Sequence, residues 1–184
     1  MMASYVSAGA VIGDRTHIYP GVFIGPGVVI GEDCVIKPGA VIGLDGFGYT
    51  HGPDGRWAPK PHEHGVFIDD DVHIGAGACI DRGSWRHTVI ESGVRIDNLV
   101  HVAHNVIVRR NAVIVAQAML AGSVEVCVGA WIAPGARVEQ RLTIGPRALV
   151  ATGAVVREDV PADQTWAGVP ARCVDATQGV REAM

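Results

Sequence analysis

Aliphatic residues recur every six positions along most of the chain. Twelve consecutive positions at this spacing between residues 90 and 156 are Ile, Leu or Val, and residues 6 to 42 hold seven more. A run of twelve would arise by chance about once in half a million trials if a third of all residues were aliphatic. A period of six fits neither an α-helix nor a simple strand alternation, and it is typical of hexapeptide β-helices. The pattern therefore predicts an all-β solenoid.

Three hexads make one triangular coil of 18 residues in the hexapeptide class, so the repeat predicts a parallel β-helix of about seven coils. Residues 18 apart in an uninterrupted stretch are then expected to lie directly over one another. By this rule Gly122 lies one coil away from His104.

The repeat is interrupted twice and then decays. Residues 44–67 are rich in Gly, Pro and aromatic side chains, which predicts a loop insertion that leaves the coil over a binding cleft. A four-residue excess in DRGSWRHTV precedes Ile90, where Asp81 and Arg82 are expected to form a local ion pair. Because Pro161 and Pro170 follow the last hexad, we predict one β-helix domain at 1–160 and an irregular C-terminal tail at 161–184.

Composition and charge exclude several classes of protein. The net charge of −4, with Lys and Arg scattered, excludes a nucleic-acid-binding footprint. The four cysteines have no short paired spacing, so we expect reduced thiols and no metal site. Neither a signal peptide nor an apolar run near 18 residues occurs, which predicts a cytoplasmic protein with no membrane span.

The residues with candidate chemistry lie in the middle of the repeat and in the insertion. His101 and His104 are three residues apart on a rigid scaffold, and an imidazole held near neutral pH is a candidate general base. The exposure of Phe47, Tyr49 and Trp57 to water would be unfavourable, so we expect them to pack on a neighbour or a ligand.

Five segments carry a family resemblance: DGFGY (45–49), IDRG (80–83), IDNLV (96–100), AHNV (103–106) and AQAMLAGS (116–123). Over roughly residues 12–150 they resemble the UDP-3-O-acylglucosamine N-acyltransferases of lipid A biosynthesis, within the left-handed β-helix acyltransferases. The resemblance implies a left-handed helix and a homotrimer with active sites between subunits. It also implies transfer of an acyl group from a thioester to the amine of an amino sugar, with a nucleotide-linked sugar as the expected acceptor.

The resemblance implies roles for individual residues. His104, in the AHN motif, would be the general base, and Gly122, in the AGS motif, would supply the N–H that binds the oxyanion. Asn105 stands where related O-acyltransferases have Asp. Substrate contacts are expected from His101, Asn98, Asn105, Gln117, Asp45 and Tyr49.

The chain also departs from the family pattern. The family's N-terminal uridine-binding domain and C-terminal helix have no counterpart in this sequence, and Gln140 and Arg141 replace the usual Gly-His pair. The ending TWAGVPAR resembles coenzyme A-dependent acetyltransferases, whereas the central motifs resemble enzymes that take the acyl group from an acyl carrier protein. Of these two co-substrates, the missing C-terminal helix favours acyl-coenzyme A, with Gly153 and Arg172 expected to bind the donor. No tightly bound cofactor is expected.

Two alternatives remain at this point. One is a metalloenzyme like the γ-carbonic anhydrases, with His73, His101 and His104 as ligands, although those enzymes space two ligands five residues apart. The other is a structural trimer without catalysis, which would leave the AHNV and AGS matches unexplained.

Overall fold

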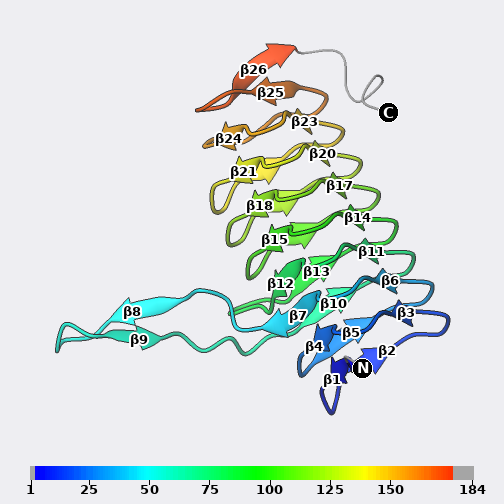
Figure 1. The fold of residues 1–184 in the computed structure, drawn as a ribbon. Helices are drawn as coiled ribbons and strands as arrows, with labels where there is room; N and C mark the ends of the chain where they lie inside the picture. Colours follow the sequence, from blue (N-terminus) through cyan, green and yellow to red (C-terminus); the bar gives the residue numbers. More distant parts are fainter. Residues whose placement is uncertain (1–2, 176–184) are drawn as a thin grey trace.

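The computed structural model describes residues 3–175, which form a parallel β-helix with three sheets along its length (Figure 1). The first sheet contains β1 (Tyr5–Val6), β4 (Phe23–Ile24), β7 (Val41–Leu44), β12 (Cys79–Asp81), β15 (His101–Val102), β18 (Met119–Leu120), β21 (Arg137–Val138) and β24 (Val155–Val156). The second contains β2 (Val11–Ile12), β5 (Val28–Ile30), β10 (Val66–Ile68), β13 (Thr88–Ile90), β16 (Ile107–Val108), β19 (Glu125–Val126) and β22 (Thr143–Ile144). The third contains β3 (His17–Ile18), β6 (Val35–Ile36), β11 (His73–Ile74), β14 (Arg95–Ile96), β17 (Val113–Ile114), β20 (Trp131–Ile132), β23 (Leu149–Val150), β25 (Thr165–Ala167) and β26 (Arg172–Asp175).

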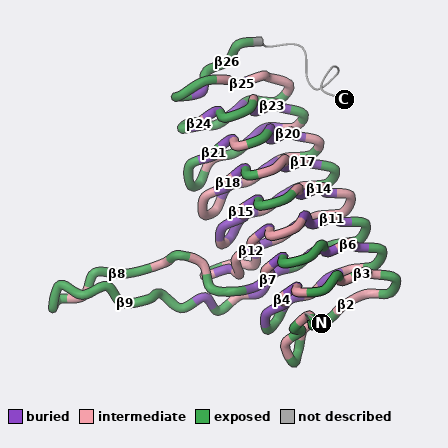
Figure 2. The backbone as a smooth tube through the Cα atoms, viewed as in Figure 1, coloured by how far each residue is buried: buried purple, intermediate pink, exposed green. Residues whose placement is uncertain are grey.

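The hexad positions form the core of the solenoid. Ile80, Val102, Leu120 and Val138 stack on successive coils of the first sheet and are almost completely buried. In Figure 2 buried residues recur along successive coils of the solenoid. His101 pairs with Met119 and Val102 with Leu120, so the predicted 18-residue stacking is confirmed.

The solenoid is longer than the expected seven coils, because its sheets hold eight, seven and nine strands. Thr165 and Trp166 of β25 pair in parallel with β23, so the ladder continues past Pro161 and the boundary expected at residue 160. Strand β26 then pairs antiparallel with β25 and covers the end of the sheet. The expected tail is therefore partly ordered strand up to residue 175, and its remainder, residues 176–184, lies outside the described residues.

Each coil has three corners, and we call the turns from the first sheet to the second sheet the first corner. The predicted insertion leaves the solenoid there, between β7 and β10, and projects as an antiparallel hairpin of β8 (Tyr49–His51) and β9 (Trp57–Pro59) (Figure 1). The four-residue excess bulges from the same corner one coil later, between β12 and β13. Both interruptions therefore lie on one edge of the molecule.

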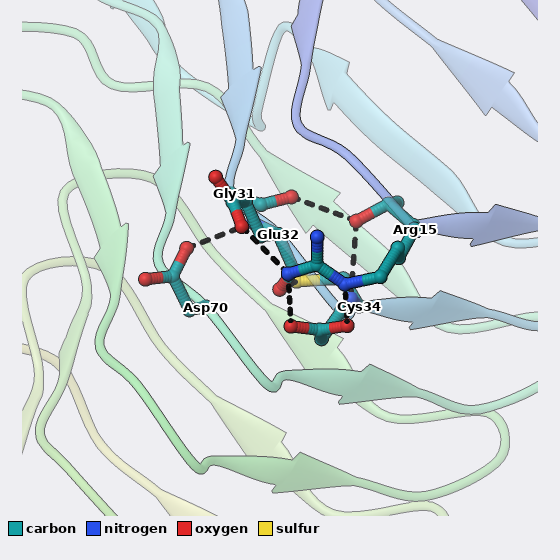
Figure 3. A network of polar contacts seen from close by, with 7 residues as sticks. Arg15, Gly31, Glu32, Cys34 and Asp70 are labelled. Atoms are coloured by element: carbon teal, nitrogen blue, oxygen red, sulfur yellow. Dashed lines mark hydrogen bonds and ion pairs between the residues drawn. The ribbon is translucent and has the colours of Figure 1, made fainter.

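The coils stack regularly across the hairpin. Strands β5 and β10 pair directly, although the insertion separates them in sequence, and the Glu32 N–H donates to Asp70 Oδ1 at 2.8 Å. Figure 3 shows this contact beside the Arg15 guanidinium, which binds Glu32 and Asp33 at 2.7 Å. The insertion is thus looped out of a continuous ladder, as predicted for a segment that cannot join it.

The four cysteines are free thiols, in agreement with their irregular spacing. No helix in residues 3–175 is long and apolar enough to cross a membrane.

Candidate active site

A groove of about 400 Å³ runs along the first sheet and its first corner. It is lined by Phe47, Asp81, His101, Ala103, His104, Met119, Ala121, Gly122, Glu139 and Gln140. Phe47 comes from the base of the hairpin, and the other residues come from consecutive coils. The groove therefore lies on the edge from which the hairpin and the bulge emerge.

His104 and Gly122 occupy equivalent places on adjacent coils of the first corner. The Ser123 N–H donates to the His104 carbonyl at 3.0 Å, which fixes the two turns against each other. The imidazole packs directly on Gly122, because a Cβ added there would lie only 2.8 Å from His104 Nε2. Within residues 3–175 the Gly122 N–H donates no hydrogen bond. The pair thus combines an imidazole with a free backbone donor.

The surroundings of His104 favour its neutral form. Burial lowers the pKa of this imidazole from its usual 6.5, and the positive charges of His62, His101 and Lys60 lower it further. A neutral imidazole is the form that can accept a proton at neutral pH. The environment is consistent with a general base.

His101 faces the half-buried carboxylate of Asp81 on the preceding coil. Its Nε2 lies 3.5 Å from Asp81 Oδ2. Burial raises the pKa of Asp81, while the nearby charges of His101 and His62 lower it. The ion pair expected between Asp81 and Arg82 is therefore wrong: Asp81 faces His101, and Arg82 donates to the His64 carbonyl at 2.8 Å.

His62 is a site residue that the sequence analysis missed. It lies at the base of the hairpin with only 7% of its surface exposed, and its ring is 5.4 Å from that of His104. The cluster of His and Lys in the segment KPHEH (60–64) was the only available signal, because the hairpin has no period from which to place it.

Asn105 has a structural role, which corrects the substrate contact expected of it. Its side chain is buried, accepts the Ser84 N–H at 2.8 Å and donates to Ser84 Oγ at 2.9 Å. The backbone carbonyl of Asn105 accepts two hydrogen bonds from the Arg86 guanidinium. Since both ends of the amide bind the bulge, no polar group of this side chain is free for a substrate.

The other expected contacts are dispersed. Asn98 and Gln117 lie at the corner that joins the third sheet to the first, where the Gln117 N–H donates to the Asn98 carbonyl. Asp45 and Tyr49 are exposed on the hairpin and do not line the groove. This placement does not bring these four side chains together with His104.

The two residues expected to bind the acyl donor, Gly153 and Arg172, are also not part of the groove lining. Gly153 is at the same corner as Gln117, and its N–H donates to the Pro134 carbonyl at 2.9 Å. Arg172, on β26, pairs with Glu158 at 2.9 Å.

No group of three or more His, Cys, Asp or Glu side chains within residues 3–175 is arranged to hold a metal ion. His73 lies on the third sheet, whereas His101 lies on the first sheet. One chain does not bring the three candidate ligands together.

A comparison with known protein families identifies the same six-residue repeat. Residues 9–44 and 87–122 match the model of the family described as bacterial transferase hexapeptide (six repeats). UDP-3-O-acylglucosamine N-acyltransferase from Caulobacter sp. (strain K31) is 42% identical over 163 residues, which are 89% of this chain and 42% of that protein. Probable UDP-3-O-acylglucosamine N-acyltransferase 2, mitochondrial, from Arabidopsis thaliana is 39% identical over 71% of this chain and 43% of its own length. The chain thus spans about two fifths of these relatives.

Solved structures share the fold. LpxA, a UDP-N-acetylglucosamine acyltransferase from Bacteroides fragilis 9343, superposes with a TM-score of 0.76 at 22% identity, over 94% of this chain and 72% of that one. This likeness confirms the left-handed parallel β-helix. With the hexapeptide match and the sequence relatives, it places the chain in the hexapeptide-repeat family that contains the UDP-3-O-acylglucosamine N-acyltransferases.

Proposed function

We propose that this chain transfers an acyl group from a thioester to the amine of a nucleotide-linked amino sugar. The observation that carries the proposal is the packing of His104 on Gly122 at the edge of the groove. Both residues lie within the motifs AHNV and AQAMLAGS, and relatives named as UDP-3-O-acylglucosamine N-acyltransferases are about 40% identical to this chain.

The chemistry requires a base and an oxyanion donor. The amine nitrogen attacks the thioester carbonyl and its proton passes to His104 Nε2, while the Gly122 N–H donates to the developing oxyanion. The C–S bond then breaks and the thiolate leaving group takes a proton, which His104 can return. A positioned base contributes roughly a hundred- to ten-thousandfold in rate, and an oxyanion donor contributes a comparable factor.

The acceptor and donor would enter the groove along the first sheet. His101, paired with Asp81, has an exposed edge that could bind the sugar or its phosphate. Gln140 follows Gly122 by one coil at the same corner and lines the groove, so it is a further candidate contact. Phe47 adds an apolar wall that suits an acyl chain.

The assembly is part of the proposal. One face of a solenoid offers little concavity, and ligand sites need walls. Phe47, Trp57 and Tyr49 are 86%, 68% and 43% exposed in the single chain, which supports a second copy packing against the hairpin. We therefore propose a homotrimer with its sites between subunits.

The test uses purified full chain, UDP-3-O-acylglucosamine as acceptor, and one acyl group supplied on either coenzyme A or acyl carrier protein. His104→Ala is expected to reduce kcat at least a hundredfold while the circular dichroism spectrum stays unchanged. A variant that keeps more than about a tenth of the wild-type rate would make His104 a binding residue only. His73→Ala, on the third sheet, is the matched control and is expected to keep full activity.

The same assay identifies the donor. The segment TWAGVPAR (165–172) resembles coenzyme A-dependent acetyltransferases, so we expect the higher kcat/KM with acyl-coenzyme A. A hundredfold preference for the carrier protein, about 2.7 kcal/mol of transition-state binding, would reverse this assignment.

A further inference from the structure

Two buried imidazole nitrogens at the groove have no hydrogen-bond partner within residues 3–175. They are Nδ1 of His104 and Nε2 of His62. The two rings are neighbours, with centroids 5.4 Å apart and planes inclined by 86°. Buried polar atoms are nearly always paired, so two unpaired atoms on adjacent side chains suggest one shared explanation.

The tautomers make these nitrogens complementary. His62 Nδ1 lies 3.0 Å from the Lys60 carbonyl, which can only accept, so Nδ1 carries hydrogen and neutral His62 has its lone pair on Nε2. A neutral His104 that accepts a proton at Nε2 carries its own hydrogen on Nδ1. The two nitrogens do not bond each other in this structure, but at a centroid separation of 5.4 Å a rotation of the rings that turns their nitrogen-bearing edges towards each other would bring the nitrogens within hydrogen-bond distance.

No carboxylate among the described residues accepts a hydrogen bond from His104 Nδ1. Asp81 faces His101 at 3.5 Å, and Gly46 lies between Asp81 and His104: a Cβ on Gly46 would be 2.8 Å from Asp81 Oδ2 and 3.1 Å from His104 Nδ1. The amide of Asn105 binds the bulge. His62 is thus the one described side chain next to His104 with a free, buried acceptor.

We propose that His62 is the positioning residue for His104: its Nε2 accepts a hydrogen bond from His104 Nδ1–H. This bond would keep the lone pair of His104 Nε2 directed to the groove and would stabilise the imidazolium formed on proton transfer. Because His62 lies on the insertion, this segment would orient the general base in addition to lining the groove with Phe47. The inference rests on the proposed role of His104.

The charged groups around His104 set the direction of the test. His62, His101 and Lys60 repel a proton on His104, so removal of a merely positive neighbour would raise the pKa of His104. Removal of a hydrogen-bond acceptor would instead lower that pKa, because the imidazolium loses its partner. The two roles of His62 therefore predict opposite shifts.

The first measurement needs no substrate. In full chain labelled with ¹⁵N-histidine, the nitrogen chemical shifts are expected to show neutral His104 as the Nδ1–H tautomer. In His62→Leu the pKa of His104 is expected to fall, and in His62→Gln, whose side-chain carbonyl can accept the bond, it should return towards the wild-type value. The control His64→Leu, on the same segment, should leave it unchanged.

An Nε2–H tautomer in the wild-type protein would overturn the proposal, even where a variant fails to fold. A raised pKa in His62→Leu would show that His62 acts as a positive charge, and an unchanged pKa would show that it only packs the hairpin; either result also overturns the proposal.

Kinetics give the second measurement. His62→Leu is expected to lower kcat roughly ten- to a hundredfold, the size of a hydrogen bond to a charged group, with a smaller change in KM. The acidic limb of kcat/KM should move to lower pH. An effect on KM alone would overturn the proposal. If His104→Ala were active while the tautomer and the pKa shift were as expected, the proposed function would fail and the His62–His104 pair would stand.

Discussion

Replacement of Gly122 by Ala tests the contact on which the proposed chemistry depends. The new Cβ would lie 2.8 Å from His104 Nε2 and 2.9 Å from Cε1, whereas ordinary van der Waals contact begins at 3.4 Å. The imidazole must therefore move by about 0.6 Å. It has little room to do so, because Gly46 and His62 pack against its other side.

The expected result is a loss of rate with little loss of stability. A displacement of about 1 Å in a reacting group costs about a hundredfold, so we expect kcat to fall roughly ten- to a hundredfold. The backbone of Gly122 has an ordinary φ, so Ala introduces no backbone strain. Unfolding in urea should change by less than about 1 kcal/mol, since Gly→Ala also restricts the unfolded chain by about that amount.

Gly135→Ala is the matched control. Gly135 also lies in a turn, its φ is +67°, and a Cβ there would contact nothing within 4 Å. This variant should lose stability, by roughly 1 kcal/mol, and keep its kcat. In the His104→Ala background, Gly122→Ala should have little further effect, because the ring it displaces is gone. A Gly122→Ala enzyme with wild-type kcat would refute the assignment of both residues.

Three further predictions follow from the same site. Asn105→Ala removes two hydrogen bonds to Ser84 and places Ala at φ +62°, so the free energy of unfolding in urea should fall by roughly 2 to 4 kcal/mol. A loss below about 0.5 kcal/mol would show that the bulge does not need this side chain. Because the pKa of His104 is lowered below 6.5, the neutral base should persist to lower pH than an exposed histidine allows, and kcat/KM should fall only as pH drops through the lowered value; an acidic limb above 6.5 would contradict this environment. Light scattering at micromolar concentration should give a trimer, and a stable monomer would count against both the assembly and a site between subunits.

The periodic part of the molecule could be predicted from the sequence because each hexad repeats one backbone conformation. The stacking of His104 and Gly122 on adjacent coils followed from their separation of 18 residues alone. The same rule also separates the remaining candidate contacts by corner. Asn98 is six residues from His104 and so lies at another corner, whereas Gln140 is 18 residues beyond Gly122 and lies at the same corner, in the groove.

The aperiodic part could not be predicted in this way. The position of His62 depends on how the hairpin folds back at its base, where Gly46 and Gly48 allow close approach to His104 and His62. The role of Asn105 depends on the bulge one coil earlier, whose backbone N–H groups its side chain binds. Both are contacts between irregular segments, and no repeat relates the residues involved.

A solenoid with three similar corners has no distinct site until the repeat is broken. This chain breaks it at the first corner on two successive coils, with the hairpin and then the bulge, and His104 occupies that corner on the next coil. Asn105 binds the bulge by its side chain while its neighbour His104 packs under the hairpin. The two interruptions therefore converge on adjacent residues of one turn. Because the turn is held from both sides and stacked on Gly122, the imidazole gains a fixed orientation that a plain hexapeptide corner would not provide.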